Sequence, residues 1–155
     1  MNWGAKKGFT LTEMLLAVLI TSFALCGIFL TYITCMDLIR ISKNASIATS
    51  AAQGLIEEIR STPFPIIANT PLENPPGFKN LNFIVNGIPS SRGIVYVDDT
   101  NPEFLRVTVS VCWQQGNKIV GEDLNLNGIL DAGEDTNGNG IIDSTVELVT
   151  QVANR

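Results

Sequence analysis

An uncharged apolar run fills residues 14–36 and limits the folds open to this 155-residue chain more than any other feature. Its length of about 23 residues is enough to cross a hydrocarbon core of ~30 Å as a helix. No later segment of the sequence approaches this length without a charge. The run therefore predicts one membrane span. The basic pair Lys6 and Lys7 before it predicts, by the positive-inside rule, that the following residues lie outside the cytoplasm.

The helical pattern continues beyond this run as one apolar stripe, with alternating spacings of three and four residues. The stripe consists of Leu38, Ile41, Ala45, Ala48, Ala52, Leu55 and Ile59. Pro63 and Pro65 then prevent continuation of the helix. We therefore predict one helix from Phe9 to near Arg60, embedded in the membrane in its first half and packed on a sheet in its second. Small and apolar residues beside the stripe disfavour the alternative of a coiled coil.

An irregular, proline-rich connector at residues 61–76 precedes five strand-like stretches. The stretches are residues 80–85, 93–98, 105–113, 118–121 and 144–152. Strict alternation over residues 105–113 predicts one buried face, formed by Leu105, Val107, Val109, Val111 and Trp113. A hairpin turn is expected at residues 115–117, and the last strand is expected beside residues 105–113. The fold class is thus α+β: a long N-terminal helix on a small antiparallel sheet whose other face meets solvent.

A short motif, Lys6-Lys7-Gly8-Phe9-Thr10-Leu11-Thr12-Glu13, stands at the entry to the apolar run. A secretory signal places its small-residue cleavage site after the apolar core, whereas the candidate here, Gly8, lies before it. This motif resembles the class III signal of type IV pilins and type II secretion pseudopilins, G-F-T-L-x-E. The resemblance implies cleavage between Gly8 and Phe9 by a prepilin peptidase that also methylates the new amine of Phe9. The alternative is an uncleaved signal anchor, in which Gly8 has no role.

The resemblance also implies a role in assembly for Glu13. A lone carboxylate near the edge of the hydrocarbon costs a few kcal/mol unless it is paired. In the family, its partner is the N-terminal amine of a neighbouring subunit, which here belongs to Phe9. Such a contact is head-to-tail and does not close on itself, so it builds a helical filament. The alternative is an acid that only complements the dipole of its own helix.

The family resemblance divides the chain into three parts. They are a leader at residues 1–8, a transmembrane and polymerisation segment at 9–36, and a pilin-like domain at 37–155 that is periplasmic or extracellular. The implied location is the bacterial inner membrane, with a single span, and afterwards a periplasmic or cell-surface filament. The implied partners are other pilin or pseudopilin subunits, the prepilin peptidase and methylase, and an inner-membrane assembly platform. Weaker patterns at residues 51–60, 106–113 and 146–150 resemble V-type minor pilins and I-type minor pseudopilins.

A second chemical feature lies at residues 122–146, within the pilin-like domain. A twelve-residue EF-type calcium pattern has glycine at its sixth position and oxygen donors at the others that the pattern requires. The donors are Asp123, Asn125, Asn127, the carbonyl of Ile129, Asp131 and Glu134. The pattern repeats twelve residues later at Asp135, Asn137, Asn139, the carbonyl of Ile141 and Asp143. Val146 replaces the last acid of the repeat, although Glu147 follows it. We therefore predict one calcium ion at the first loop and a second site that is weaker, incomplete, or completed by a shared or distant oxygen. The alternative is an Asn- and Gly-rich turn without metal.

Charge and cysteine content support a structural use of calcium. Six of the fifteen acidic residues and none of the ten Lys and Arg residues fall within residues 122–143, where a divalent cation would neutralise them. The three cysteines, Cys26, Cys35 and Cys112, are expected to be buried thiols and show no disulfide framework. Many Gram-negative major pilins carry a C-terminal disulfide. Calcium is therefore expected to supply folding energy that a disulfide supplies in those proteins.

The sequence thus predicts a structural subunit, of minor type, of a type IV pilus or a type II secretion pseudopilus. The alternatives are a calcium-dependent adhesin at a filament tip and a competence pseudopilin that serves DNA uptake. An enzyme is not expected, because histidine is absent and no nucleophile constellation or phosphate-binding glycine loop is recognisable. Without a basic patch, nucleic acid is not an expected partner.

Overall fold

The structure is a computed structural model that describes residues 8–154. The chain forms two compact units, one ending at Arg40 and the other beginning at Ile41. Helix α1 (Leu11–Ser61) contributes to both units. Its bounds confirm the long helix predicted from the apolar run and the stripe, with a start two residues after Phe9.

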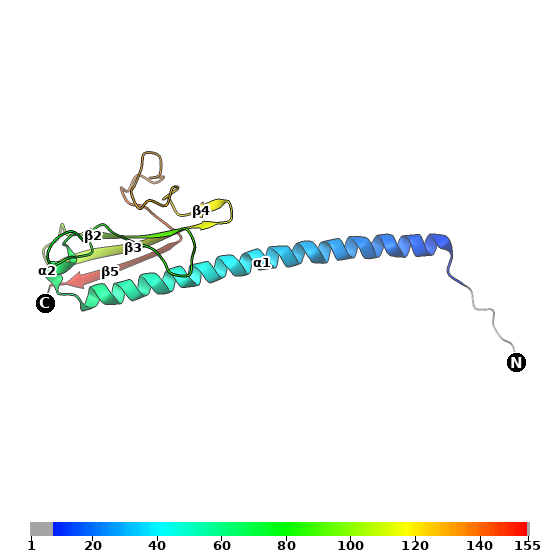
Figure 1. Cartoon of the computed structure of the whole chain (residues 1–155), viewed down its shortest axis with the longest axis horizontal. Helices are drawn as coiled ribbons and strands as arrows, with labels where there is room; N and C mark the ends of the chain where they lie inside the picture. The colour runs from blue at the N-terminus through cyan, green and yellow to red at the C-terminus, as the bar shows by residue number, and fades with distance from the viewer. Residues whose placement is uncertain (1–7, 155) are drawn as a thin grey trace. The chain divides into compact units, whose positions relative to one another are not determined.

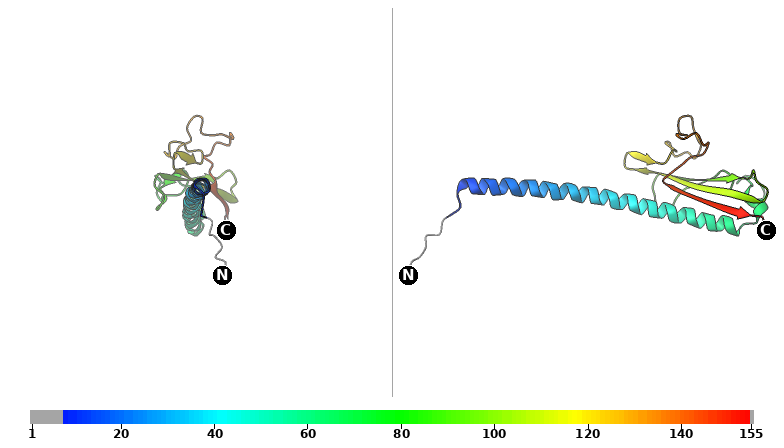
Figure 2. Two further views of the ribbon diagram at one scale, coloured as in Figure 1. Left: turned by 90° about the vertical axis from the view of Figure 1, so that its right-hand side faces the viewer. Right: turned by 180° about the vertical axis from the view of Figure 1, so that it is seen from behind.

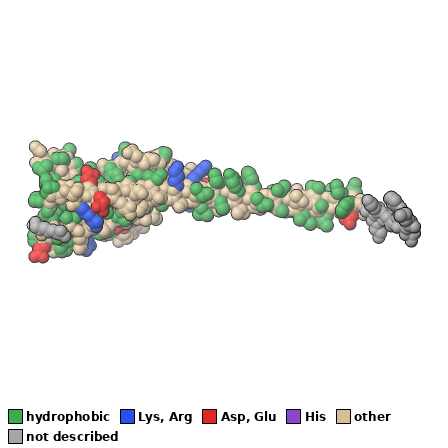
Figure 3. All heavy atoms as spheres, turned by 90° about the horizontal axis from the view of Figure 1, so that it is seen from below, with side chains coloured by type: hydrophobic (Ala, Val, Ile, Leu, Met, Phe, Trp, Pro, Cys, Tyr) green, Lys and Arg blue, Asp and Glu red, His purple; other side chains and the backbone are tan. Residues whose placement is uncertain are grey.

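In the first unit, the residues of α1 up to Arg40 carry exposed apolar side chains, and Figure 3 shows them along this part of the helix. By length and composition α1 is apolar enough to cross a membrane. Thr21 and Thr31 satisfy their hydroxyl groups within the helix, where they donate to the carbonyls of Ala17 and Gly27 at 2.7 and 2.9 Å. This surface suits lipid. The predicted burial of two thiols is wrong here, because Cys26 and Cys35 lie on this exposed helix.

The second unit contains the predicted antiparallel sheet (Figure 1). Its strands are β1 (Leu81–Phe83), β2 (Ser91–Asp98), β3 (Phe104–Gln115), β4 (Lys118–Val120) and β5 (Val146–Ala153). The order runs β1-β2-β3-β4. On the edge of β3 away from β2, β4 pairs with residues 113–115 and β5 pairs with residues 104–111. All five predicted strands are confirmed, and β5 lies beside β3 as expected. The connector differs from the prediction, because it contains a one-turn helix, α2 (Phe64–Ile67), with a proline in its first turn, where proline is tolerated.

The C-terminal part of α1 packs under the sheet (Figure 2). All five residues of the predicted inner face of β3 are buried there. On the helix, Ala48, Ala52 and Ile59 are fully buried, which confirms the stripe in this half. The stripe was predicted too long, because Leu38 and Ile41 are exposed, and Ile56, which lies off it, is buried instead. Small alanines let the helix approach the branched side chains of the sheet closely.

The opposite face of the sheet, which was predicted to meet solvent, is covered around Ile94 and Cys112 but stays exposed at Val149 on β5. The segment between β4 and β5 folds over it, on the side away from α1 (Figures 1 and 2). Ile142 from this segment is fully buried against Ile94 and Cys112, with Leu126 and Leu130 packed around them. The prediction missed this layer because the apolar residues of the loops are isolated among polar ones and show no strand or helix period.

Candidate functional site

The predicted cleavage site precedes the first helical turn. Gly8 and Phe9 are both exposed, Phe9 to 85%, and α1 begins at Leu11. A peptidase can therefore reach the bond between Gly8 and Phe9 without unwinding the helix. The basic pair Lys6 and Lys7 lies outside the described residues.

The predicted assembly residue, Glu13, is bound to its own helix start. The backbone N–H and the hydroxyl group of Thr10 both donate to Glu13 Oε2, each at 2.8 Å. In return, the Glu13 N–H donates to Thr10 Oγ1 at 3.3 Å. This reciprocal pair is a capping box, which satisfies backbone groups that a helix leaves unpaired at its N-terminus. In the single chain, Glu13 thus acts as the helix-terminal acid that the sequence left open as an alternative.

The first acidic loop, residues 123–134, is wrapped around its own side-chain oxygens. Asp123 is fully buried and accepts hydrogen bonds from the N–H groups of Asn127 at 3.0 Å and Gly128 at 2.8 Å. Asn125 Oδ1 accepts from the same Asn127 N–H at 2.9 Å, and Asn127 Oδ1 accepts from the Ile129 N–H at 2.6 Å. Gly128 has a φ of 79°, which glycine adopts without strain. The sharp turn that the EF-type pattern requires is therefore formed.

Three side chains of this loop converge on one point. The amide Nδ2 atoms of Asn125 and Asn127 donate to Asp131 Oδ2 at 2.8 and 2.9 Å. The oxygen and nitrogen atoms of an amide exchange places by a half-turn of the group, so the same convergence can present oxygens only. Such a set of carboxylate and amide oxygens is what calcium prefers. The residues of the first loop thus fit a calcium ion.

Glu134, the last predicted ligand of the first loop, is also buried, at 6% exposure. Its Oε1 accepts from the Leu124 N–H at 2.8 Å, and its Oε2 accepts from the Asp131 N–H at 3.0 Å. It therefore joins the two sides of the loop. Within residues 8–154, no three Asp, Glu, Cys or His side chains are grouped as a metal centre. Calcium at this loop accordingly stays a prediction.

The second acidic loop, residues 135–146, repeats the bonding of the first twelve residues later. The equivalent residues are Asp135, Asn137, Asn139, Gly140, Ile141 and Asp143. Asp135 accepts from the N–H groups of Asn139 at 3.1 Å and Gly140 at 2.9 Å. Asn139 Oδ1 accepts from the Ile141 N–H at 2.9 Å, and the Nδ2 atoms of Asn137 and Asn139 both donate to Asp143 Oδ2. With a φ of 78° at Gly140, the two loops have the same internal architecture.

Glu122, which the sequence pattern did not include, belongs to this second loop. Its Oε1 accepts from the Thr136 N–H at 3.1 Å, and its Oε2 accepts from the Asp143 N–H at 3.2 Å. Hydrogen bonding from Thr136, the largest cause, and from the Asp143 N–H holds the pKa of Glu122 below its ordinary value. A signal for this residue existed, because Glu122-Asp123 recurs as Glu134-Asp135 at the same twelve-residue interval.

Polar contacts hold both loops on the outer face of the sheet. Arg92 Nε donates to the Leu126 carbonyl at 3.1 Å, and the Ile142 N–H donates to the Tyr96 hydroxyl oxygen at 3.0 Å. Burial is the main cause that raises the pKa of Tyr96. The sequence did not predict these contacts, because the side chains come from β2, far from the loops along the chain.

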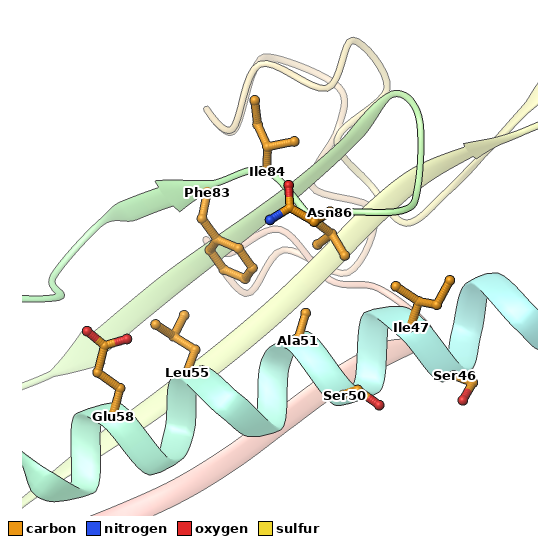
Figure 4. A pocket seen from close by; sticks show the side chains of 10 residues that line it. Ser46, Ile47, Ser50, Ala51, Leu55, Glu58, Phe83, Ile84 and Asn86 are labelled. Carbon is orange, nitrogen blue, oxygen red and sulfur yellow. The ribbon is translucent and has the colours of Figure 1, made fainter.

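An apolar groove of about 550 Å³ lies between α1 and the β1 edge of the sheet (Figure 4). Ile47, Ala51 and Leu55 line it from the helix, and Phe83 and Ile84 line it from the sheet side. Glu58 is the one titratable side chain among these described lining residues. The groove offers apolar contact rather than a pair of acid and base groups.

Comparison with known proteins gives one match. Residues 3–29 match the family model of the prokaryotic N-terminal methylation motif. This match supports a type IV pilin-like prepilin, a class whose members are structural subunits processed by a prepilin peptidase and assembled with other pilins. The helix-on-sheet architecture of the chain is consistent with the pilin fold. Searches of curated proteins and of solved structures returned no significant match to the chain.

Proposed function

We propose that this chain is a membrane-anchored structural subunit, of minor type, of a type IV pilus or a type II secretion pseudopilus. The observation that carries the proposal is the methylation motif at residues 3–29, placed at the start of an exposed apolar helix. That helix continues into a domain in which its second half packs under a sheet. Membrane storage, processing and lateral packing of helices would all use the first unit. The second unit would remain outside the membrane.

Processing after Gly8 would place a methylated amine on Phe9, two residues before α1. In the single chain, both hydrogen bonds that Thr10 donates to the Glu13 carboxylate end on Oε2. The amine of a neighbouring subunit would compete for this carboxylate with a full positive charge, and an ionic donor binds more strongly than a neutral one. Glu13 would thus exchange a local helix cap for a contact between subunits.

A cleavage assay tests the proposal. We expect Gly8→Ala to leave uncleaved precursor in the membrane and to block its incorporation into filaments. Gly27→Ala is the matched control, because it makes the same change at an open position of α1 outside the proposed cleavage site. Detection of a normal N-terminus beginning at Phe9 in Gly8→Ala would refute the processing assignment.

Calcium is the second part of the proposal. Asp123, Asn125, Asn127, Asp131, Glu134 and the Ile129 carbonyl would hold one ion at the first loop, and the equivalent residues of the second loop would hold another. Bound calcium supplies positive charge to a segment that carries six acids and no base. The loop segment buries its own Ile142 against Ile94 and Cys112 of the sheet, so fixing the loops would also stabilise this outer layer.

Thermal unfolding of the full chain in detergent tests this part. The melting temperature should fall on chelation and recover on addition of about 1 mM calcium, in the range of extracellular sites. Asp131→Asn should reduce this recovery. Asp37→Asn, the same change on an exposed part of α1, should leave it intact. No recovery in protein shown to be metal-free would refute a stabilising calcium site.

A calcium-dependent adhesin is the second candidate. Leu124 and Ile129 on the first loop are each 60% exposed, which favours contact with a ligand. Chelation that abolished surface binding but left the melting temperature and assembly unchanged would support this candidate over the structural one. Loss of DNA uptake alone on deletion, with secretion and piliation intact, would instead assign the chain to a competence filament.

A further inference from the structure

The second loop lacks an acid at the position that Glu134 occupies in the first. Val146 stands there, and its side chain is buried in the core under the sheet. We propose that Glu122 supplies the missing closing carboxylate, so that the second loop is a complete site for a hard divalent cation such as calcium. This inference rests on the calcium part of the proposed function and deepens it.

The contacts of Glu122 reproduce those of Glu134. Each glutamate accepts one N–H through Oε1 from the second residue of its loop and one through Oε2 from the ninth. For Glu134 the distances are 2.8 and 3.0 Å, and for Glu122 they are 3.1 and 3.2 Å. The N–H donors to Oε1 are Leu124 and Thr136, and the N–H donors to Oε2 are Asp131 and Asp143. The members of each pair are twelve residues apart in the sequence. The two carboxylates thus stand at equivalent places, although Glu122 precedes both loops in the chain.

The path of the backbone explains how a residue before the first loop reaches the second. The Glu122 N–H donates to the Asp143 carbonyl at 2.9 Å, which joins the start of the segment to its end. Asp143 is in turn held on the sheet, where its carbonyl also accepts from Cys112 Sγ at 3.8 Å. The side chain of Glu122 can therefore bond to the second loop, whereas that of Val146 is buried in the core.

One observation outside the loops concerns the face of the sheet that they cover. Ser110 on β3 is fully buried, and its hydroxyl oxygen has no hydrogen-bond partner among the described residues. Ser110 lies two residues from Cys112, on the sheet face that the loops cover, and its register partner on β5 is Glu147.

The second loop gathers three carboxylates, those of Glu122, Asp135 and Asp143, in a segment that contains no basic residue. Carboxylates gathered in one loop repel one another, and a bound cation offsets this repulsion. A cation held by the second loop, with Glu122 as its closing carboxylate, would supply that positive charge.

Calcium binding by the full chain in detergent tests the inference. Equilibrium dialysis gives the number of ions bound, and the backbone amide NMR signals of Gly128 and Gly140 report the two loops separately. We expect two ions for the wild-type chain, with both signals responding. Glu122→Gln should weaken binding at the second loop about tenfold or more, as loss of a supporting carboxylate does in other metal sites, while the Gly128 response remains. Glu134→Gln should weaken the first loop.

Glu73→Gln is the control, because it removes the same charge from an exposed position outside the loops, and it should leave both responses intact. Two bound ions and an unchanged Gly140 response in Glu122→Gln would overturn the inference. One ion in the wild-type chain, sensed by Gly128 alone, would also overturn it but leave the calcium part of the proposed function standing. No bound ion in the wild-type chain would refute both.

Discussion

The backbone N–H and the hydroxyl group of Thr10 both approach Glu13 Oε2 at 2.8 Å, so a single carboxylate oxygen receives two donors at the start of α1. This contact links two uses of one residue. As a capping box it begins the helix, and as a charge near the edge of an apolar segment it is available to an incoming amine.

Replacement of Glu13 should separate these uses. Glu13→Gln keeps an oxygen acceptor for Thr10 but removes the charge. We expect the precursor to be inserted and cleaved normally, while the assembled fraction falls by about tenfold or more, because the loss of an ion pair costs at least about 1.4 kcal/mol. Cell fractionation and recovery of sheared filaments measure both quantities. Thr21→Val, which removes a hydroxyl group from another turn of α1, should assemble normally. Normal assembly of Glu13→Gln would exclude the charge contact.

Gly121 allows the start of the loop segment to lie against Cys112. A Cβ atom on Gly121 would meet Cys112 Sγ at 2.3 Å, and φ is 105°. Gly121→Ala should therefore destabilise the chain by about 2–4 kcal/mol, the combined cost of overpacking and of a strained backbone. Gly133→Ala is the control, because φ is 93° there but nothing lies within 4 Å of the added atom. Denaturant unfolding should show a clearly smaller loss for Gly133→Ala. Equal losses would mean that the Cys112 contact does not limit residue 121.

Two buried serines should respond in opposite ways to the same substitution. Ser91 Oγ accepts from the Val85 N–H at 3.2 Å and donates to the Ile88 carbonyl at 3.0 Å, whereas Ser110 Oγ has no partner among the described residues. In chelator, Ser91→Ala should lower the free energy of unfolding by about 1–3 kcal/mol, and Ser110→Ala should raise it by about 1 kcal/mol. Calcium should diminish the gain from Ser110→Ala if a cation gives the hydroxyl group a role. A loss of stability in Ser110→Ala without metal would contradict the absence of a partner.

Tyr96 should make the attachment of the loops sensitive to alkaline pH. Its pKa is raised above the ordinary 10.0, first by burial and then by the nearby negative charges. A raised pKa in the folded state means that its contribution to stability is complete below pH 10 and is lost as the pH rises through the folded value. Absorbance titration in a Tyr32→Phe background should show this late ionisation of Tyr96. Tyr96→Phe should lose about 1–2 kcal/mol at neutral pH, because the Ile142 N–H loses its acceptor.

Much of the fold follows from local patterns. The apolar run and the stripe predict α1, and alternation along β3 predicts which of its side chains face the helix. The exposure of Leu38 and Ile41 was missed because a stripe shows that a helix has an apolar face but not how far the partner surface extends. The burial of Ile56 was missed for the same reason, because the width of the buried helix face depends on the sheet and not on the helix alone.

The candidate site shows a different limit. Both loops were recognised because their donors follow one another along the chain at fixed spacing. Tyr96 was not, because it lies on β2 and only the folded sheet brings it near the loops. Glu122 was not, because it stands before the first loop although it bonds to the second. The capping box, in contrast, has a sequence signature, because Thr10 and Glu13 stand three residues apart just before an apolar run.

The closing contacts of the two loops have a consequence for how this segment can be moved or shortened. Glu122 stands directly before Asp123 and closes the second loop, and Glu134 stands directly before Asp135 and closes the first. The first loop therefore carries its own closing glutamate, whereas the second depends on one that stands before the first loop. Residues 123–134 could be transplanted with their glutamate, but transplanting residues 135–146 alone would leave Glu122 behind. The smallest segment that keeps the second loop closed is therefore residues 122–146, which necessarily includes the first loop.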